Sequence, residues 1–279
     1  MVTGLPVYER GLEPPRLQGY TIDLVIEARS FDEYFVPALF EPWARDLIRR
    51  AQVWKGDTVV DLACGTGIVA CRIAGTGARV IGIDSSAERL AQAKVRAAEE
   101  AVPVTWMMRD FSATTLPSAS AMLVTCQHGL QFAQDRLAVV REARRLLASG
   151  GRALFACWSP VELQAGHKWI EAAAVNHFGG GYGGGFSLGG EAEMKQLLTD
   201  AKFMAVQVET ATRLVRFPDP ARFIEQSLRA IADERGVTDA AAIEAAIVQA
   251  TESLAPMIVD DKLEMMTSSV IGVGRVSAK

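Results

Sequence analysis

The chain has few of the residues from which metal sites and disulfide frameworks are built. Its 279 residues include three histidines and four cysteines. The cysteines form no C-x-x-C pair and all lie in apolar segments, which predicts buried free thiols and a reducing compartment. They are Cys64, Cys71, Cys126 and Cys157. No tight cluster of His, Asp and Glu has the spacing of metal ligands, so we expect no bound metal.

Basic stripes and long apolar runs are also missing. The net charge is −4 and the basic residues are scattered, which argues against a nucleic-acid partner because phosphate neutralisation needs a concentrated basic surface. No apolar run reaches the roughly 20 residues of a membrane span, and residues 1–20 carry early charges and prolines in place of a signal-peptide core. We expect a cytoplasmic protein with a small-molecule partner. Its oligomeric state is left open, a homodimer included.

What is present is the pattern of an α/β enzyme. Hydrophobic residues make up 49% of the chain and charged residues 22%, ordinary values for a globular protein that buries a large core. Residues 135–151 are predicted to form a helix that ends at glycine. Alternating strands and helices indicate a mainly parallel sheet with helices on both faces. The first five strands are predicted at 58–63, 78–84, 102–110, 121–127 and 152–158.

A glycine turn follows the first predicted strand. In "VVDLACGTGIVA", Gly65, Gly67 and Ala70 match the dinucleotide fingerprint G-x-G-x-x-A. Glycines there let a ligand approach the free N–H groups of a helix N-terminus. Asp84 ends the next strand, where a carboxylate suits ribose hydroxyls. The motif therefore indicates a nucleotide-like ligand and leaves open which one.

Asp61 bears on that choice, because it lies four residues before Gly65. A pyrophosphate at the glycine turn would meet a like charge in a partly desolvated site. S-adenosylmethionine (SAM) has no phosphate, and its ammonium and sulfonium groups suit a carboxylate. A role in capping the loop is the alternative for Asp61. An NAD-binding oxidoreductase would also need a proton donor such as Tyr-x-x-x-Lys, which the sequence lacks.

Five motifs in order resemble a class I SAM-dependent methyltransferase of the ubiquinone/menaquinone-biosynthesis type. They are "VVDLACGTG", "VIGIDSS", "RDFSATTLP", "LVTCQHGLQF" and "EARRLLASGGRALFACW". The resemblance is close over residues 58–158 and loose elsewhere. It implies an α/β, Rossmann-like, doubly wound sheet of seven strands in the order 3-2-1-4-5-7-6, with a mainly helical cap. The last strand, "KLEMMTSSVIGVGRV", would be antiparallel.

The resemblance also implies the cofactor contacts. The methionine end of SAM would be held by Asp61, Gly65 and Gly67, with backbone groups of Ala63 and Cys64. The ribose, adenine and sulfonium would be contacted by Asp84, Ser85, Asp110, Phe111 and Cys126. Of these, Asp84 would bind the ribose hydroxyls and Asp110 the adenine amino group. The product would be S-adenosyl-L-homocysteine.

Six segments are predicted along the chain. Residues 1–50 form an N-terminal helical segment over the cofactor site, and 51–158 the SAM-binding core. Residues 159–190 form a cap or flap insertion, and 191–212 a core helix and strand. A helical cap insertion, 213–258, precedes the last core strand at 259–279.

His128 is the candidate catalytic residue. It directly follows the fourth predicted strand, near the point where the strand order reverses and ligands bind. Histidine titrates near neutrality, so His128 can remove a proton from a hydroxyl or amine. A positioning contact, or a structural role beside Gln127 or Gln131, is the alternative. A carboxylic acid acceptor is already ionised at pH 7 and needs no base.

The cap is expected to bind the methyl acceptor. Four residues are candidates for substrate binding: His167, His177, Tyr182 and Phe186. The glycine-rich run 179–190 is either a flap over the acceptor or a surface loop. The predicted function is methyl transfer from SAM to a small, partly hydrophobic metabolite at oxygen (EC 2.1.1.-). Transfer to nitrogen or carbon, an NAD-binding oxidoreductase and a non-catalytic SAM-binding protein are the alternatives.

Overall fold

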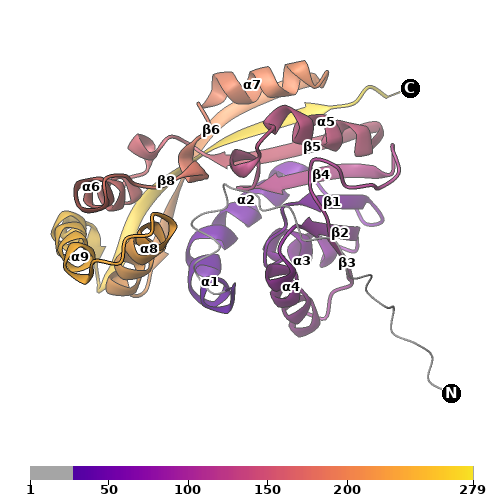
Figure 1. The fold of residues 1–279 in the computed structure, drawn as a ribbon. Helices are drawn as coiled ribbons and strands as arrows, with labels where there is room; N and C mark the ends of the chain where they lie inside the picture. The colour runs from indigo at the N-terminus through magenta and orange to yellow at the C-terminus, as the bar shows by residue number, and fades with distance from the viewer. Residues whose placement is uncertain (1–27, 279) are drawn as a thin grey trace, which may run out of the picture.

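One mixed sheet organises the computed structural model, which describes residues 28–278 (Figure 1). The segment considered for a signal peptide lies outside the described residues. The sheet order is β3-β2-β1-β4-β5-β8-β6, with β7 paired to β8. The strands are β1 (Thr58–Leu62), β2 (Arg79–Asp84), β3 (Val104–Met108), β4 (Ala121–Gln127), β5 (Leu147–Trp158), β6 (Met204–Phe217), β7 (Ile258–Val259) and β8 (Lys262–Arg275).

The strand directions confirm the predicted sheet. β1 to β5 pair in parallel, whereas β8 runs antiparallel to both β5 and β6. Counting β8 as the predicted seventh strand gives the expected order 3-2-1-4-5-7-6. The two-residue strand β7 was not predicted.

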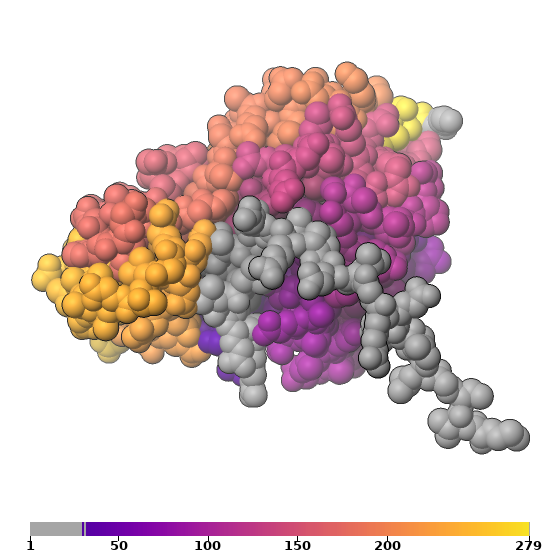
Figure 2. Space-filling model, viewed as in Figure 1, coloured from indigo at the N-terminus to yellow at the C-terminus, as the bar shows by residue number. Residues whose placement is uncertain are grey.

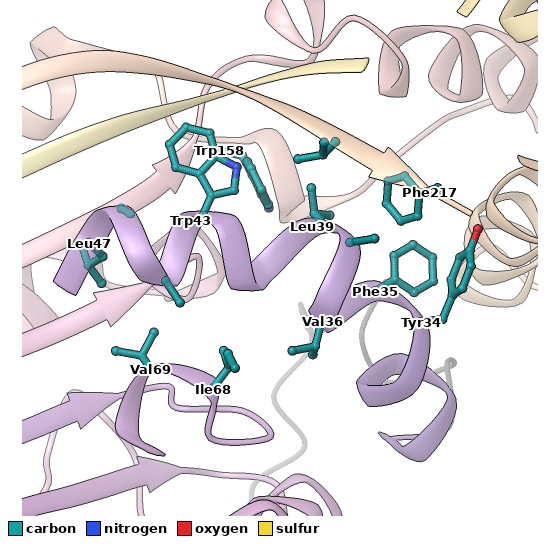
Figure 3. Packing of buried hydrophobic residues seen from close by; sticks show 14 of the residues in the cluster. Tyr34, Phe35, Val36, Leu39, Trp43, Leu47, Ile68, Val69, Trp158 and Phe217 are labelled. Carbon is teal, nitrogen blue, oxygen red and sulfur yellow. The ribbon is translucent and has the colours of Figure 1, made fainter. Parts of the chain in front are cut away.

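Helices cover both faces of the sheet. Trp43 and Leu47 lie on one side in the same apolar cluster as Ile68 and Val69 (Figure 3), while α5 and α7 contribute to a second cluster. The arrangement is that of a Rossmann-like fold. The helices are α1 (Ala28–Phe35), α2 (Glu41–Ala51), α3 (Ile68–Ala74), α4 (Ala87–Glu99), α5 (Arg136–Leu146), α6 (His167–Phe178), α7 (Glu191–Asp200), α8 (Pro220–Glu234) and α9 (Ala240–Leu254).

The predicted C-terminal end of the helix before β5 is wrong. α5 stops at Leu146, and β5 begins at Leu147 instead of Arg152. Leu147 already pairs with Ala121 of β4, and the register then shifts before Arg152 pairs with Leu123. Gly150 has φ +75° within this irregularity. Tertiary pairing with β4 thus overrides the helical spacing of "RRLLASGG".

β6 and β8 form a long ribbon that carries the cap. They pair from Met204–Arg275 to Phe217–Leu263, whereas β5 stops at the Trp158–Ser269 pair. β6 is therefore longer than the strand predicted at 203–210. Beyond the end of β5, α6, α8 and α9 form one lobe beside the core (Figure 2). Across residues 28–278, no helix has the length and apolar character needed to traverse a bilayer.

Candidate active site

The turn between β1 and α3 has a backbone that depends on glycine. Ala63, Gly65 and Gly67 have φ values of +52°, +55° and +85°. The Gly67 N–H donates to the Cys64 carbonyl at 2.9 Å, closing the turn. A Cβ on Gly67 would lie 2.7 Å from the Trp106 ring and 3.0 Å from Cβ of Ala93. The indole of Trp106 therefore packs directly against the turn.

Gly67→Ala is expected to destabilise the protein through both backbone strain and this contact. The positive φ costs about 1–2 kcal/mol and the overpacking about 1–3 kcal/mol more. Gly179→Ala is the matched control, because Gly179 has φ +74° with no atom within 4 Å of the added Cβ. Urea unfolding measures both variants. Equal losses of unfolding free energy would show that Trp106 imposes no constraint on the turn.

Asp61 at the end of β1 is a buried carboxylate with one free oxygen. It is 1% exposed, and its Oδ1 accepts a hydrogen bond from the Thr125 hydroxyl at 2.7 Å. Its Oδ2 makes no hydrogen bond with any described residue. Burial raises the pKa of Asp61 to about 7, Asp84 adds to the rise, and Thr125 and the Ala70 backbone oppose it. A donor that carries a positive charge would satisfy this oxygen.

Two further carboxylates lie at the same edge of the sheet. Asp84 ends β2, and its oxygens accept from the N–H groups of Gly65 at 2.8 Å and Ser86 at 2.9 Å. It thereby ties the glycine turn to the start of α4, beside the exposed Ser85. Asp110 follows β3, is exposed, and accepts from the N–H and hydroxyl of Ser112 at 2.7 Å. The fold thus brings Asp61, Asp84 and Asp110 to one edge of the sheet.

The remaining residues predicted beside the cofactor are buried. Phe111 and Cys64 are nearly inaccessible, and Cys126 is fully so. A Cβ on Gly129 would overlap Cβ of Ala63, so the segment after β4 lies against the glycine turn. Burial raises the pKa of the Cys64 and Cys126 thiols well above the ordinary value. All four cysteines are free and buried, as predicted.

His128 is locked between aromatic rings. It is 5% exposed, and its ring stacks on Trp158 with centroids 3.6 Å apart and the planes 7° from parallel. Trp43 and Phe40 present edges to it at 6.0 and 5.8 Å. Nε2 lies 2.9 Å from the Ser269 hydroxyl of β8, and Nδ1 has no partner among the described residues.

Burial also decides the charge of His128. It lowers the pKa of the imidazole to about 3. The ring is therefore neutral at pH 7 and a weak base. The backbone at His128 has φ +53°, and its N–H donates to Ala156 of β5 at 2.7 Å. A neutral ring fixed in this way suits a positioning role better than proton removal.

Gln131, considered from the sequence only as a neighbour of His128, is also buried. It is 2% exposed, and neither side-chain atom has a hydrogen-bond partner among the described residues. Its backbone carbonyl accepts from Arg136 Nη2 at 3.3 Å and from the Ser187 hydroxyl at 3.1 Å. The signal in the sequence was the concentration of polar residues, Gln127, His128 and Gln131, in an apolar segment directly after a strand.

Three of the four predicted substrate-binding residues meet in the cap. The His167 ring lies 5.9 Å from Tyr182 and 5.4 Å from Phe186, and those two rings lie 5.0 Å apart. Phe223 of α8 stands 5.5 Å from His167. His177 lies apart from them, where its Nε2 is 3.0 Å from Oε1 of Gln249 in α9. The structure therefore separates His177 from the other candidates.

The glycine-rich run 179–190 is fixed to the cap. The Tyr182 N–H donates to Glu171 at 2.6 Å, and Arg235 donates to the Gly181 carbonyl at 3.2 Å. A Cβ on Gly180 would overlap Arg235, and one on Gly181 would overlap Glu171. The glycines therefore let the run pass between these two side chains. Among residues 28–278, no group of three or more His, Cys, Asp or Glu side chains is arranged to hold a metal.

Comparison with known proteins agrees with this geometry. Residues 59–151 match the family model described as a methyltransferase domain. This stretch of the chain is therefore similar to a methyltransferase domain. The matched residues contain the glycine turn, Asp61, Asp84, Asp110 and His128.

Curated relatives match about two fifths of the chain. The ubiquinone biosynthesis O-methyltransferase of Sodalis glossinidius is 36% identical over 111 residues, which are 39% of this chain and 44% of that protein. The ubiquinone/menaquinone biosynthesis C-methyltransferase of Rubrivivax gelatinosus is 35% identical over 112 residues, 40% of this chain and 43% of that protein. The match thus spans less than half the length of either relative.

A solved structure extends the similarity to the rest of the fold. The YcgJ protein of Bacillus subtilis superposes with a TM-score of 0.59 at 17% identity, covering 85% of this chain and 98% of that protein. At this identity the likeness concerns the fold alone. The shared fold therefore extends well beyond residues 59–151.

Proposed function

We propose that this protein transfers a methyl group from SAM to a small, partly hydrophobic metabolite, with oxygen as the acceptor atom. The observation that carries the proposal is the unpartnered Oδ2 of Asp61, buried beside the glycine turn. No basic side chain is among the groups that shift the pKa of Asp61. An ammonium group of the ligand would supply the missing charge and hydrogen bond. A pyrophosphate would add a second negative charge instead.

The residues present fit SAM along its length. Asp61 would hold the ammonium of the methionine end, with backbone groups of the glycine turn beside it. Asp84 keeps acceptor capacity for ribose hydroxyls, since each carboxylate oxygen accepts more than one hydrogen bond. Asp110 and Phe111 would contact the adenine. When bound, SAM supplies a methyl group activated by its sulfonium, and S-adenosyl-L-homocysteine is the product.

His128 acts as a positioning residue in this proposal. When Nε2–H donates to the Ser269 hydroxyl, Nδ1 is the free acceptor on a ring that stacks on Trp158. A neutral imidazole can accept a hydrogen bond from the hydroxyl of the methyl acceptor and fix its direction. Because the pKa of His128 is about 3, the proton of that hydroxyl is released to water instead of being kept on the ring.

His128→Ala separates positioning from base catalysis. We expect kcat to fall by about 10- to 100-fold, the range that loss of a positioning contact gives, and by the same factor at pH 6 and pH 9. The measurement is initial rate against pH for wild type and variant. A general base would make the factor depend on pH across its pKa. Trp169→Ala, an exposed α6 substitution, serves as the control.

The acceptor atom is tested by the stability of the product. The relatives matched above are named for O- and for C-methyl transfer, so they do not decide the acceptor atom. We propose oxygen because Nδ1 of His128 can accept a hydrogen bond from a hydroxyl group. Labelled SAM is incubated with phenols, carboxylic acids, amines and quinol-like compounds, and each product is treated with mild base. If a phenol is labelled and the label is not released by mild base, the product is a methyl ether, which supports transfer to oxygen. Transfer to amines or carbon alone would contradict the acceptor atom.

A further inference from the structure

A chain of ion pairs joins the first two helices to the two helices that flank the glycine turn. Arg96 of α4 pairs with Asp32 of α1, and also with Glu100 at the end of α4 at 3.5 Å. Arg72 of α3 pairs with the same Glu100 and, at 3.0 Å, with Glu41 of α2. Each basic group thus lies between two acidic groups, and each acidic partner comes from a different helix or a helix end.

Arg96 also contacts the glycine turn itself. Its Nε donates to the carbonyl of Thr66, a residue that is 3% exposed and lies between the two glycines, at 3.1 Å. The N–H of the same peptide belongs to Gly67 and donates to the Cys64 carbonyl at 2.9 Å. Because a peptide unit is planar, these two hydrogen bonds fix its orientation. Arg96 therefore holds one peptide of the turn to which the proposed function assigns the cofactor.

A second peptide of the turn is held in the same way. The Gly65 N–H donates to Asp84 at 2.8 Å. The peptide between Gly65 and Thr66 thus has a held peptide on each side, which limits the directions that its N–H can take. Backbone N–H groups at a helix N-terminus bind ligands best when they are ordered before the ligand arrives, since binding then costs less entropy.

Burial makes the position of Arg96 depend on Asp32. Both side chains are 12% exposed, and a guanidinium removed from water needs an opposite charge and hydrogen-bond acceptors. The planar fork of Arg96 reaches both at once, because Nη2 binds Asp32 while Nε binds the Thr66 carbonyl. If the charge of Asp32 is removed, the acidic partner that Arg96 keeps is Glu100, which is more distant and is shared with Arg72.

Asp32 is itself held in place by contacts on two sides of α1. α1 lies between α8 of the cap and α4 of the core (Figure 1). On the cap side, the Ser30 hydroxyl accepts from Arg222 at 3.2 Å and from Gln226 at 3.1 Å. On the core side, Gln92 of α4 donates to the second carboxylate oxygen of Asp32 at 3.3 Å. The carboxylate that faces Arg96 is therefore fixed before any ligand binds.

We infer, building on the proposed function, that Arg96 is a positioning residue for SAM binding and that it requires Asp32 of α1 for this role. Arg96 acts through the Thr66 carbonyl, which it holds so that the N–H groups of the glycine turn keep their directions. Neither Arg96 nor Asp32 belongs to the glycine motif. The residues that determine SAM affinity thus extend from the turn to the contact between α4 and α1.

The test measures SAM affinity by isothermal titration calorimetry in the full chain. The variants are Arg96→Met, Arg96→Lys, Asp32→Asn and the double variant of Arg96→Met with Asp32→Asn. Arg144→Met is the matched control, because Arg144 on α5 also donates its Nε to a backbone carbonyl, that of Lys202 at 2.9 Å, at an exposed position. The free energy of unfolding in urea is measured for each variant, and each titration is made where the variant is folded.

Arg96→Met should lower SAM affinity by about 3- to 30-fold, a loss typical of residues that act on a ligand through another group. Arg96→Lys should lower it by a smaller factor, because lysine keeps the charge but replaces the fork with one nitrogen. Asp32→Asn should lower the affinity when Arg96 is present and have no further effect in Arg96→Met, since both residues act through one contact. Arg144→Met should leave the affinity unchanged.

Two results would overturn the inference. One is a SAM affinity equal to that of the wild type in both folded Arg96 variants, which is what a purely structural ion pair predicts even where the free energy of unfolding falls. The other is an equal loss of affinity from Asp32→Asn with and without Arg96. In both cases the wild type still binds SAM, so the proposed cofactor site stands. Failure of the wild type to bind SAM at all would instead overturn the proposed function and this inference with it.

Discussion

Asp61→Asn is expected to weaken SAM binding by about 10- to 100-fold at pH 8, the range for one charge-assisted hydrogen bond with its ion pair. Asparagine keeps the shape and the contact with Thr125 but loses the negative charge. The side-chain NH2 group that replaces the unpartnered Oδ2 is a donor, so it cannot accept a hydrogen bond from the ammonium of SAM. Isothermal titration calorimetry measures the affinity, and a smaller loss at pH 6 is expected because protonated Asp61 resembles asparagine.

The same substitution has a signature in the ligand-free protein. The folded-state pKa of Asp61, about 7, lies above its ordinary value of 3.8. The protonated form therefore stabilises the fold. This contribution is complete below about pH 4 and is lost as the pH rises through 7. The stability of wild type relative to Asp61→Asn should fall over this interval. A difference that is constant from pH 4 to pH 8 would contradict the burial of Asp61.

SAM binding near neutral pH should also release a proton. The ammonium favours the carboxylate form, so binding lowers the pKa of Asp61. Calorimetry in two buffers with different ionisation enthalpies would give different apparent binding enthalpies at pH 6.5. Asp61→Asn should lose this difference. Retention of the difference in the variant would assign the proton to another group.

Asp84→Ala is expected to reduce SAM affinity by about 100-fold or more, because it removes the acceptor for two ribose hydroxyls. It also releases the N–H groups of Gly65 and Ser86, which the carboxylate now holds at 2.8 and 2.9 Å. The affinity for adenosine is the second measurement, since adenosine has the ribose and lacks the methionine end.

Asp110→Ala serves as the comparison for Asp84→Ala. Because Asp110 is exposed, its loss should lower the affinities for adenosine and SAM by similar factors, both smaller than those of Asp84→Ala. Asp84→Ala should strongly lower the affinity for both ligands, whereas Asp61→Asn should leave the affinity for adenosine unchanged. If Asp84→Ala binds SAM as tightly as the wild type, the ribose contact is assigned to the wrong residue.

The sheet order and the residues at the carboxyl edge of the parallel strands were predictable because each is indicated by a short stretch of sequence. The parallel strands contain short apolar runs, and Asp61, Asp84 and Gln127 stand at or next to the ends of β1, β2 and β4. The carboxyl ends of neighbouring parallel strands meet at one edge, so Asp61, Asp84 and Asp110 had to converge. The glycine turn is equally local, since positive φ at Gly65 and Gly67 favours glycine.

The environment of His128 was not predictable, because distant residues create it. Trp158 ends β5 and Ser269 lies on β8, 141 positions along the chain. Their packing lowers the pKa of His128 and turns a plausible base into a neutral ring. Spacing in the sequence places the histidine at the right edge of the sheet but does not report its burial.

The cap and the start of β5 were likewise decided by tertiary contacts. Leu147 joins β5 because Ala121 pairs with it, although "RRLLASGG" has helical spacing. The flap is held by Glu171 of α6 and by Arg235, which directly follows α8. Arg152, buried against the carbonyls at the end of α2, gave no signal in the sequence. Each of these features depends on partners far apart in the chain.

Competition between SAM and NAD for the wild-type protein tests the account most directly. Both ligands carry adenosine, so the glycine turn and Asp84 alone do not choose between them. Asp61 does, because its carboxylate attracts an ammonium and repels a pyrophosphate. We expect SAM to bind at one site per chain and NAD not to displace it. In Asp61→Asn, the ratio of the affinity for SAM to the affinity for NAD should be smaller than in the wild type. Tight binding of NAD by the wild type, or an unchanged affinity ratio in Asp61→Asn, would contradict the account.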